Sequence, residues 1–468
     1  MLATDGADHA AKMGDQDLQP AHSRPPTARV SRPGYVLFLM ACLTALNVMD
    51  RQLLSVLIDP IKQEFGVSDR SMGLLTGTAF ALLHGTAAIP IAVAADRGVR
   101  RSIIALGLSV WSGLTFLTGF ARSYAEIFAI RVGVGIGEAA GGAPAQSLLS
   151  DTFPPERRAT ALSILTIGGP LGSILVFSLG GWLADAYGWR VAFMVFGAPG
   201  LLLAALIRFT VPEPARGVFD ARRNAVGAPD SSRPEPDAGI PFAQAVRFLF
   251  SVASIRSVFF ASGLHAVGMY AVLGWSVPYL TRVHGISTGE AGARLALASG
   301  LLTAVGTLAG GALADRLAQR SLRWLVWQPA LALIAAFPFA VGFVFASSAS
   351  SAMLCLAPVS VLTGSCFGPF YSVIQTLVAP RMRALAAALA VTFNTILGLG
   401  FAPPLIGWLN DIGAQTWGAE AIRYSLLAAL TAQLGAALCL WIAGRTLDRD
   451  LSAKEAFVGA QRGAQRGA

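Results

Sequence analysis

The chain has 468 residues, of which 54% are hydrophobic and 13% are charged. A soluble domain carries about 25% charged residues, so this composition excludes an ordinary soluble enzyme or binding module. The formal net charge of +9 does not indicate nucleic-acid binding, because the basic residues form short clusters between apolar segments. The four cysteines lie inside apolar segments at unrelated spacings, which indicates neither a disulfide framework nor a metal site.

Apolar segments of about 20 to 28 residues recur along the chain, long enough to cross a hydrocarbon core roughly 30 Å thick. Lipid offers the backbone no hydrogen-bond partners, so these segments are predicted to be helices. The first six spans lie near 34–58, 71–95, 102–121, 124–150, 158–184 and 189–211. The second six lie near 254–281, 289–313, 323–346, 351–378, 383–409 and 422–444. The fold class is therefore an all-α membrane protein of twelve transmembrane helices.

The chain divides into two helical bundles, joined by a linker and flanked by tails. We expect an amino-terminal bundle over 33–211, a linker over 212–250 and a carboxy-terminal bundle over 251–446. The linker is rich in Pro, Gly, Ser and charge, which is typical of a flexible connection. Residues 1–32 have no apolar segment and are expected to form a disordered tail, not a cleaved signal peptide. Residues 447–468 end in a low-complexity repeat and are expected to be disordered too.

Basic residues predict the orientation of the spans. The side that carries both termini holds 26 of the 35 Lys and Arg residues, and the opposite side holds seven. Because cytoplasmic loops are enriched in Lys and Arg, both termini are expected in the cytoplasm and the protein in the inner membrane.

An internal repeat relates the two sets of six spans. AVAADR after the second span is matched by GALADR after the eighth, 219 residues later. PERRA before the fifth span is matched by PRMRA before the eleventh, and GWLAD ending the fifth by GWLND ending the eleventh, at offsets of 225 and 226. Matches at nearly constant offset indicate duplicated bundles, an arrangement that supports rocking about a site between them.

The loop after the second span resembles the signature of the major facilitator superfamily, G-x-x-x-D-R-x-G-R-R. Here it reads AVAADRGVRR, which keeps both charged pairs but replaces the two glycines with Ala92 and Val99. Arg131 also resembles the arginine of the superfamily's fourth helix, and Gly169 with Pro170 partly resembles the motif of its fifth. The resemblance covers nearly the whole apolar part of the chain and implies a transporter that works by alternating access.

Three stretches of the first half resemble the Spinster-type branch of this superfamily: NVMDRQ, SDRSMGLLTGTAFAL, and RVGVGIGEAAGGAPAQSLLSD followed by FPPERRA. Spinster-type proteins are associated with lysophospholipids and sphingoid lipid phosphates, with proton coupling proposed for some. The resemblance therefore implies an amphipathic, anionic lipid as the solute.

Four ionisable side chains lie deep inside predicted spans: Asp50, Arg51, Arg131 and Glu138. Such a group costs about 2.5 to 3.5 kcal/mol in mid-membrane, so each needs a partner or a function. Glu138 and Asp50 are the predicted proton-linked carboxylates, because a carboxylate that gains or loses an arginine neighbour changes its proton affinity. Arg51 is the predicted ligand for an anionic head group, with Arg131 and Asn47 in the same binding region. The alternative is a static set of salt bridges joining the first and fourth spans.

The second six spans carry no comparable charge, and a cavity with one charged wall and one apolar wall favours an amphipathic solute over a sugar. Candidate contacts on that wall are Tyr270, Phe367, Phe370, Tyr371, Gln375 and Asn394. His84 is a further candidate contact, and it and His265 could titrate near neutral pH. Ordinary helix packing is the alternative for each. The glycines of the fourth span, at 133, 135, 137, 141 and 142, are expected to allow close helix packing.

Charged residues at the cytoplasmic helix ends are assigned, through the superfamily resemblance, to a latch that stabilises the outward-facing state. These residues are Asp96, Arg97, Arg100, Arg101, Asp315 and Arg316. Ordinary positive-inside topology also explains the arginines, but it does not explain the two aspartates at equivalent positions.

The sequence thus predicts a monomeric secondary transporter for an amphipathic lipid of the lysophospholipid type, with protons and membrane lipids as its other partners. The alternative is a proton-coupled carrier of small organic anions or drugs. A membrane receptor or scaffold is a different class, and the charged residues inside a duplicated bundle disfavour it. No nucleotide-binding loop, metal cluster or nucleophile motif is present, so neither an enzyme nor a cofactor is expected.

Overall fold

The computed structural model describes residues 33–215, 242–378 and 382–466 of the chain. Every regular element in these ranges is helical, and most are α-helices of transmembrane length. Helix is the conformation that long apolar segments adopt in lipid, because it satisfies each backbone hydrogen bond within the segment.

The amino-terminal half contains six transmembrane helices, three of which are interrupted. In chain order its elements are α1 (Pro33–Val56), α2 (Ile58–Phe65), α3 (Asp69–Gly73), η1 (Leu74–Thr78), α4 (Ala79–Arg97), α5 (Arg100–Thr118), α6 (Tyr124–Glu138), α7 (Gly142–Thr152), α8 (Pro155–Leu175), η2 (Val176–Gly180), α9 (Gly181–Tyr187) and α10 (Trp189–Thr210). The second helix is α3, η1 and α4 together, the fourth is α6 with α7, and the fifth is α8, η2 and α9.

The carboxy-terminal half repeats this plan. Its elements are α12 (Phe242–Ser251), α13 (Ala253–His284), α14 (Thr288–Ala296), η3 (Leu297–Leu302), α15 (Thr303–Ala318), α16 (Trp324–Val344), α17 (Ala349–Gly364), α18 (Phe367–Leu377), α19 (Arg383–Phe393), η5 (Asn394–Phe401), α20 (Ala402–Trp417), η6 (Gly418–Glu420) and α21 (Ala421–Arg466). The eighth helix is α14, η3 and α15, the tenth is α17 with α18, and the eleventh is α19, η5 and α20.

Ten segments of the described chain are long and apolar enough to span a membrane. One of them, Leu385–Ser452, covers both the eleventh and twelfth helices. The fourth helix is not among the ten, because it is interrupted between α6 and α7. The structure therefore confirms the all-α membrane fold, with predicted spans and observed helices in the same order.

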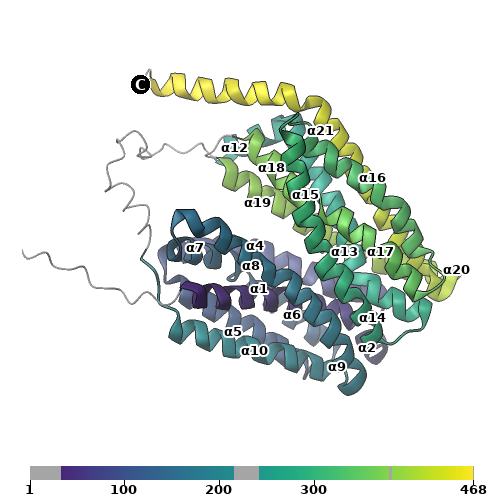
Figure 1. Cartoon of the computed structure of the whole chain (residues 1–468). Coiled ribbons are helices and arrows are strands. Elements are labelled where there is room, and N and C mark those ends of the chain that lie inside the picture. Colours follow the sequence, from purple (N-terminus) through teal and green to yellow (C-terminus); the bar gives the residue numbers. More distant parts are fainter. Residues whose placement is uncertain (1–32, 216–241, 379–381, 467–468) are drawn as a thin grey trace, which may run out of the picture.

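The two halves meet at one end of the molecule, where α3 packs on α20 and α14 packs on η2 and α9. We call this end the junction. Figure 1 shows the halves diverging from it toward the end where α7, α12 and the carboxy-terminal part of α21 lie, which we call the diverging end.

Four π-helical segments occur in the described chain, one in each of the helices that join the halves. They are η1, η2, η3 and η5, in the second, fifth, eighth and eleventh helices. Segments η1 and η5 contact each other, and the Thr78 hydroxyl donates a 2.7 Å hydrogen bond to the Gly400 carbonyl across the halves. Such segments are often found at functional positions, because they free a backbone carbonyl from the regular ladder.

Glycines let helix backbones touch within the amino-terminal half, as expected for the fourth helix. A Cβ atom added to Gly135 would lie 2.7 Å from the Phe80 carbonyl oxygen, and one on Gly137 would lie 2.9 Å from Trp111. Gly142 differs, since nothing lies within 4 Å of such an atom there. It opens α7 instead, just after the interruption of the fourth helix.

Two segments differ from the expected linker and tail. Within the expected linker, Phe242–Ser251 forms α12, which packs against the start of α13 through buried Leu249. Past residue 446, α21 continues to Arg466, so this part of the expected disordered tail is helical. Its Ala, Gln, Arg, Lys and Glu residues are strong helix formers, which explains the continuation. Residues 1–32 and the central part of the linker lie outside the described residues.

Candidate functional site

The first buried ion pair joins α1 to α6. The Arg131 guanidinium donates to Asp50 at 2.8 Å, and the Thr115 hydroxyl of α5 donates to the same carboxylate. Arg131 is 1% exposed and Asp50 is 5% exposed. With partners from three helices and almost no access to solvent, this pair fixes α1, α5 and α6 together.

A second ion pair lies beside it on the same two helices. The Arg51 Nε donates to Glu138 Oε2 at 2.7 Å, and the Asn47 amide donates to the same oxygen at 2.8 Å. Glu138 is buried, whereas the Arg51 side chain is 29% exposed. The other carboxylate oxygen, Glu138 Oε1, has no partner among the described residues.

The two pairs therefore differ in what they can do. A guanidinium with open surface can exchange its carboxylate for another anion, and its planar fork suits a phosphate or carboxylate group. Arg131 has no such surface. The structure brings together the four charged residues expected at the site, and it separates one accessible arginine from one sealed arginine.

His84 lies near the same cluster. Its Nδ1 lies 3.3 Å from the Gly135 carbonyl of α6, and its ring stacks on Phe80 with centroids 4.8 Å apart. Phe80 lies one turn before His84 on α4, and its local sequence gives no sign that it belongs to the site.

The predicted contacts of the carboxy-terminal half spread over a wider surface. Tyr270 on α13 is near enough to Arg51 to interact with it electrostatically, and Tyr371 on α18 interacts with Tyr270 in turn. Gln375 and Asn394 are partly buried, and neither forms a side-chain hydrogen bond to the described chain. Only Tyr270 therefore joins the charged cluster in this conformation.

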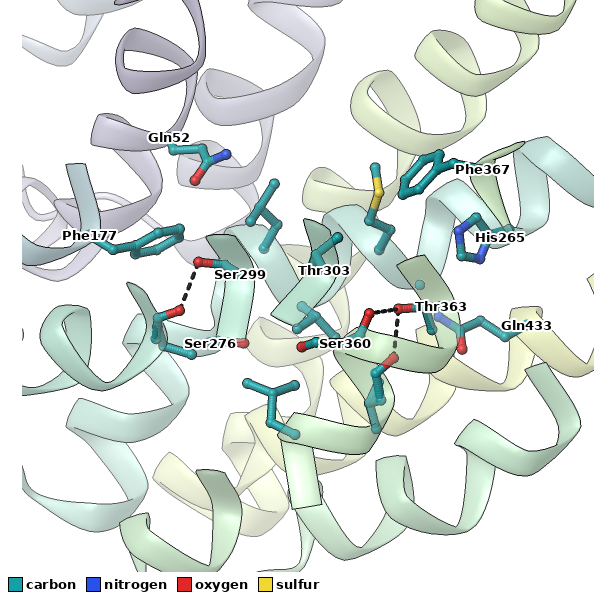
Figure 2. A pocket seen from close by; sticks show the side chains of 17 residues that line it. Gln52, Phe177, His265, Ser276, Ser299, Thr303, Ser360, Thr363, Phe367 and Gln433 are labelled. Atoms are coloured by element: carbon teal, nitrogen blue, oxygen red, sulfur yellow. Dashed lines mark hydrogen bonds between the residues drawn. The ribbon is translucent and has the colours of Figure 1, made fainter. Parts of the chain in front are cut away.

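A pocket lined by both halves includes Gln52, the residue that follows Arg51 in α1 (Figure 2). It encloses about 740 Å³ of space not filled by protein atoms, part of which is continuous with solvent. Its lining consists of Gln52, Phe177, His265, Gly268, Met269, Val272, Leu273, Ser276, Leu295, Ser299, Thr303, Leu356, Val359, Ser360, Thr363, Phe367 and Gln433. Six of these residues follow one face of α13 from His265 to Ser276, a length of about 16 Å at 1.5 Å per residue.

The pocket wall is more apolar than its composition suggests. The hydroxyls of Ser299, Thr303 and Thr363 donate to carbonyls of their own helices. His265 is 1% exposed, packs between Phe367 and Phe370, and has no hydrogen-bond partner at either ring nitrogen among the described residues. Phe367 thus lines this pocket.

The residues assigned to a latch lie at helix ends away from the junction. Arg100 is buried within the amino-terminal half, where it binds Asp151 at 2.5 Å and Glu213 at 2.8 Å. Arg101 donates to the Val211 carbonyl at 2.8 Å. Arg97, Asp315 and Arg316 are exposed, and the side chain of Asp96 lies outside the described part of the structure.

A network of charges closes the junction, and sequence reasoning did not identify it. Arg282 of α13 binds Asp59 at 2.6 Å and Asp69 at 2.5 Å, both in the amino-terminal half. Lys62 binds Asp69 at 2.6 Å, and the Asn410 amide of α20 donates to it at 3.1 Å. In the sequence, Lys62 and Arg282 indicate only the orientation of the spans.

The repeated GWLAD and GWLND motifs supply two further sets of junction contacts. Asp411 of α20 accepts hydrogen bonds from the backbone amides of Asp69 and Arg70, at 3.0 and 2.9 Å, where the second helix begins. Asp185 of α9 accepts one from the Gly289 amide at 2.7 Å, where the eighth helix begins. Each half therefore caps a helix N-terminus of the other half.

Outside the spans, α2 is tied to the start of α10. Glu64 accepts hydrogen bonds from Arg190 at 2.6 Å and from the Trp189 indole at 2.7 Å. Hydrogen bonding to Arg190, and then to Trp189, lowers the pKa of Glu64 from its ordinary value. A lowered pKa means that this contact contributes stability at neutral pH, and that the contribution is lost as the pH falls through the folded-state pKa.

These features define an all-helical membrane transporter made of two similar halves with charged residues between them. The model of the Major Facilitator Superfamily matches residues 40–403, so the chain belongs to this superfamily. Members of this family and the Spinster-type relatives are transporters and not enzymes, which confirms the expected class.

Similar proteins point to the Spinster-type branch. An "MFS-type efflux pump" of Mycolicibacterium smegmatis is 33% identical over 414 residues, covering 88% of this chain and 93% of that protein. A sphingosine-1-phosphate transporter of Mus musculus is 29% identical over 404 residues, covering 82% and 72%. The crystal structure of a bacterial homologue of the human lysosomal transporter Spinster, described as inward-facing and unoccupied, matches with a TM-score of 0.80 at 29% identity, covering 89% of this chain and 98% of that one.

Proposed function

We propose that this protein moves an amphipathic, anionic lipid of the lysophospholipid type across the membrane by alternating access, coupled to protons. The observation that carries this proposal is Arg51, which holds a buried carboxylate while keeping 29% of its side chain exposed. Its neighbour in the chain, Gln52, lines the apolar pocket. An anionic group and a hydrocarbon chain joined in one molecule would therefore find partners at successive residues of α1.

The shape of the pocket supports a chain-like ligand. Its lining residues follow α13 for about 16 Å, and three of its hydroxyls, those of Ser299, Thr303 and Thr363, are bonded to their own helices. A sugar would leave many hydroxyls without partners on such a wall, which is unfavourable. We assign the head group to Arg51, with Tyr270 beside it, and the hydrocarbon chain to the pocket. Asn47, His84, Arg131, Tyr371, Gln375 and Asn394 stay in the proposed binding region as supporting residues.

Proton coupling is assigned to Glu138 first. When Glu138 is ionised it holds Arg51, and when it takes up a proton it releases the guanidinium to a lipid phosphate. Asp50, the second proposed carboxylate, keeps Arg131 and Thr115 as buried partners.

We infer from the distribution of basic residues that both termini are cytoplasmic and that the protein lies in the inner membrane. The junction then faces the periplasm, and the conformation described above is inward-facing. Rocking would break the junction network and bring the diverging ends together. We propose that Asp96, Arg97, Arg100, Arg101, Asp315 and Arg316 form the latch of that second, outward-facing state.

The second candidate is a proton-coupled carrier of small organic anions or drugs. The efflux-pump name of the relative from Mycolicibacterium smegmatis favours it, and it would use Arg51 and Glu138 in the same way. The apolar pocket would then accept an aromatic or aliphatic drug in place of a lipid chain.

Transport into proteoliposomes separates the two candidates. The solutes are lysophosphatidylglycerol, zwitterionic lysophosphatidylcholine and a small dicarboxylate, each measured with and without a pH gradient. We expect gradient-dependent movement of the anionic lysolipid and a loss of about tenfold or more in Arg51→Gln, because a charged hydrogen bond contributes about 1.5 to 3 kcal/mol. Transport of the dicarboxylate alone would refute the lipid assignment.

Glu138→Gln tests the coupling. This variant is expected to move the lysolipid down its own gradient while losing the response to a pH gradient. Arg122→Gln, which changes an exposed arginine far from the pocket, is the matched control and is expected to behave as the unmodified protein. Full pH dependence in Glu138→Gln would remove Glu138 from the mechanism.

A further inference from the structure

Phe80 lies close to both ion pairs. The centre of the Arg51 guanidinium lies 4.8 Å from the Phe80 ring centroid, and that of Arg131 lies 5.8 Å from it. Phe80 is 1% exposed and sits on α4, whereas both arginines belong to other helices. One aromatic ring therefore contacts both cations of the site.

The contact has the geometry of a cation–π interaction. An aromatic face carries partial negative charge, and it attracts a guanidinium centred within about 6 Å of the ring. Such attraction is strengthened where water is excluded, as it is around this buried ring. Like charges also repel, so a ring near both guanidinium groups offsets part of the cost of burying Arg51 and Arg131 in one region.

The backbone around Phe80 holds the ring in place. A Cβ atom on Gly135 of α6 would lie 2.7 Å from the Phe80 carbonyl oxygen, so α4 and α6 touch at this point. On the other side, the His84 ring stacks on Phe80 with an interplanar angle of 22°. The ring is thus fixed by two helices, while Arg51 is attached to α1 through a long and partly exposed side chain.

We propose that Phe80 is a positioning residue for transport, which holds Arg51 in the place where it can exchange Glu138 for an anionic head group. This inference rests on the proposed function. Phe80 is too buried to contact the solute, so it acts through Arg51. When Glu138 releases Arg51, the ring keeps the guanidinium near Phe80 and prevents it from moving away into solvent.

Fluorinated phenylalanines at position 80 test the proposal without changing the packing much. Each added fluorine weakens the negative face of the ring, so binding of lysophosphatidylglycerol in detergent is expected to weaken stepwise, by about three- to thirtyfold over the series. The same series at Phe193 is the control, because this residue is buried in the same half and no described cation lies over its ring. Equal affinity across the Phe80 series would overturn the proposal.

A second measurement needs no ligand and keeps the inference separable from the proposed function. In a double-mutant cycle on unfolding in detergent, Phe80→Leu and Arg51→Gln are expected to be coupled by about three- to thirtyfold in the unfolding equilibrium constant. Additive effects would mean that Phe80 only packs, and would overturn the proposal. If the cycle shows coupling but no lysolipid binds to any variant, Phe80 positions Arg51 as inferred and the proposed substrate is wrong.

Discussion

At the scale of single residues, two arginines of the same chemistry have different environments. Arg131 is sealed with Asp50 and Thr115, whereas Arg51 shares Glu138 with Asn47 and remains partly exposed. A sealed pair contributes to stability only while both partners are present, because removal of one leaves a buried charge without compensation. An accessible pair can exchange partners at lower cost.

Asp50→Asn is therefore expected to destabilise the folded protein by about 3 to 5 kcal/mol, because it leaves the Arg131 guanidinium buried without an opposite charge. Unfolding in detergent measures this loss. The double variant Asp50→Asn with Arg131→Gln is expected to be more stable than Asp50→Asn alone, since it removes the uncompensated charge. A double variant that is less stable than the single variant would contradict this assignment.

The sequence predicted this pairing because only four ionisable residues fall deep in the spans, and because the opposed directions of the first and fourth helices bring them to similar depth. It did not indicate which arginine would be accessible. Thr115 of α5 and Phe80 of α4 complete these pairs, and neither carries a sign in its local sequence of what it contacts.

At the scale of elements, the junction depends on glycines that allow backbone contact between helices of opposite halves. A Cβ atom on Gly407 would lie 2.1 Å from the Asp69 carbonyl oxygen, and one on Gly292 would lie 2.1 Å from the Phe177 carbonyl oxygen. Backbone atoms cannot move aside as a flexible side chain can. The closed junction therefore requires glycine at these positions.

Gly407→Ala is expected to open the junction and shift the population toward the opposite conformation. Spin labels at Gln63 and Gln415, both exposed at the junction and in different halves, report this as a longer distance in a background without the four native cysteines. Gly142→Ala is the control, because nothing lies within 4 Å of its added Cβ atom. An unchanged distance in Gly407→Ala would show that the junction tolerates the extra atom.

The lengths and order of the helices could be predicted because apolar segments of membrane length are distinctive. Their interruptions could not. The break between α6 and α7 falls where several glycines were interpreted only as packing positions, and the π-helical segments keep the same apolar pattern as the α-helices around them. A single additional residue in one turn does not change hydrophobic periodicity enough to be detected.

At the scale of the whole molecule, the duplication predicts the arrangement of the junction. Ser68 and Ser287 accept hydrogen bonds as N-caps of the second and eighth helices, and they lie 219 residues apart, the offset of the AVAADR and GALADR match. Asp185 and Asp411 then cap these helices from the opposite half. The sequence contains both copies of the motif. Only the packing of the halves shows that each copy faces a helix N-terminus of the other half.

Asp185→Ala with Asp411→Ala is expected to favour the state in which the junction is open. A capping side chain contributes about 1 kcal/mol, so each substitution should change the ratio of the two states by about fivefold. The label pair at Gln63 and Gln415 measures this ratio. Asp448→Ala, which removes an exposed ion pair with Arg323, is the control and is expected to leave the ratio unchanged.

The exchange of caps also bears on how steeply the protein responds to its solute. Each half supplies an acceptor and receives one, and both contacts lie at the same end, so one rigid rotation severs the two at once. The free energies of the two caps add, so their effects multiply in the equilibrium constant for opening. An intermediate that keeps only one cap is then little populated. Because the six-helix unit is duplicated, a single short motif supplies two caps, and both must break before the junction opens.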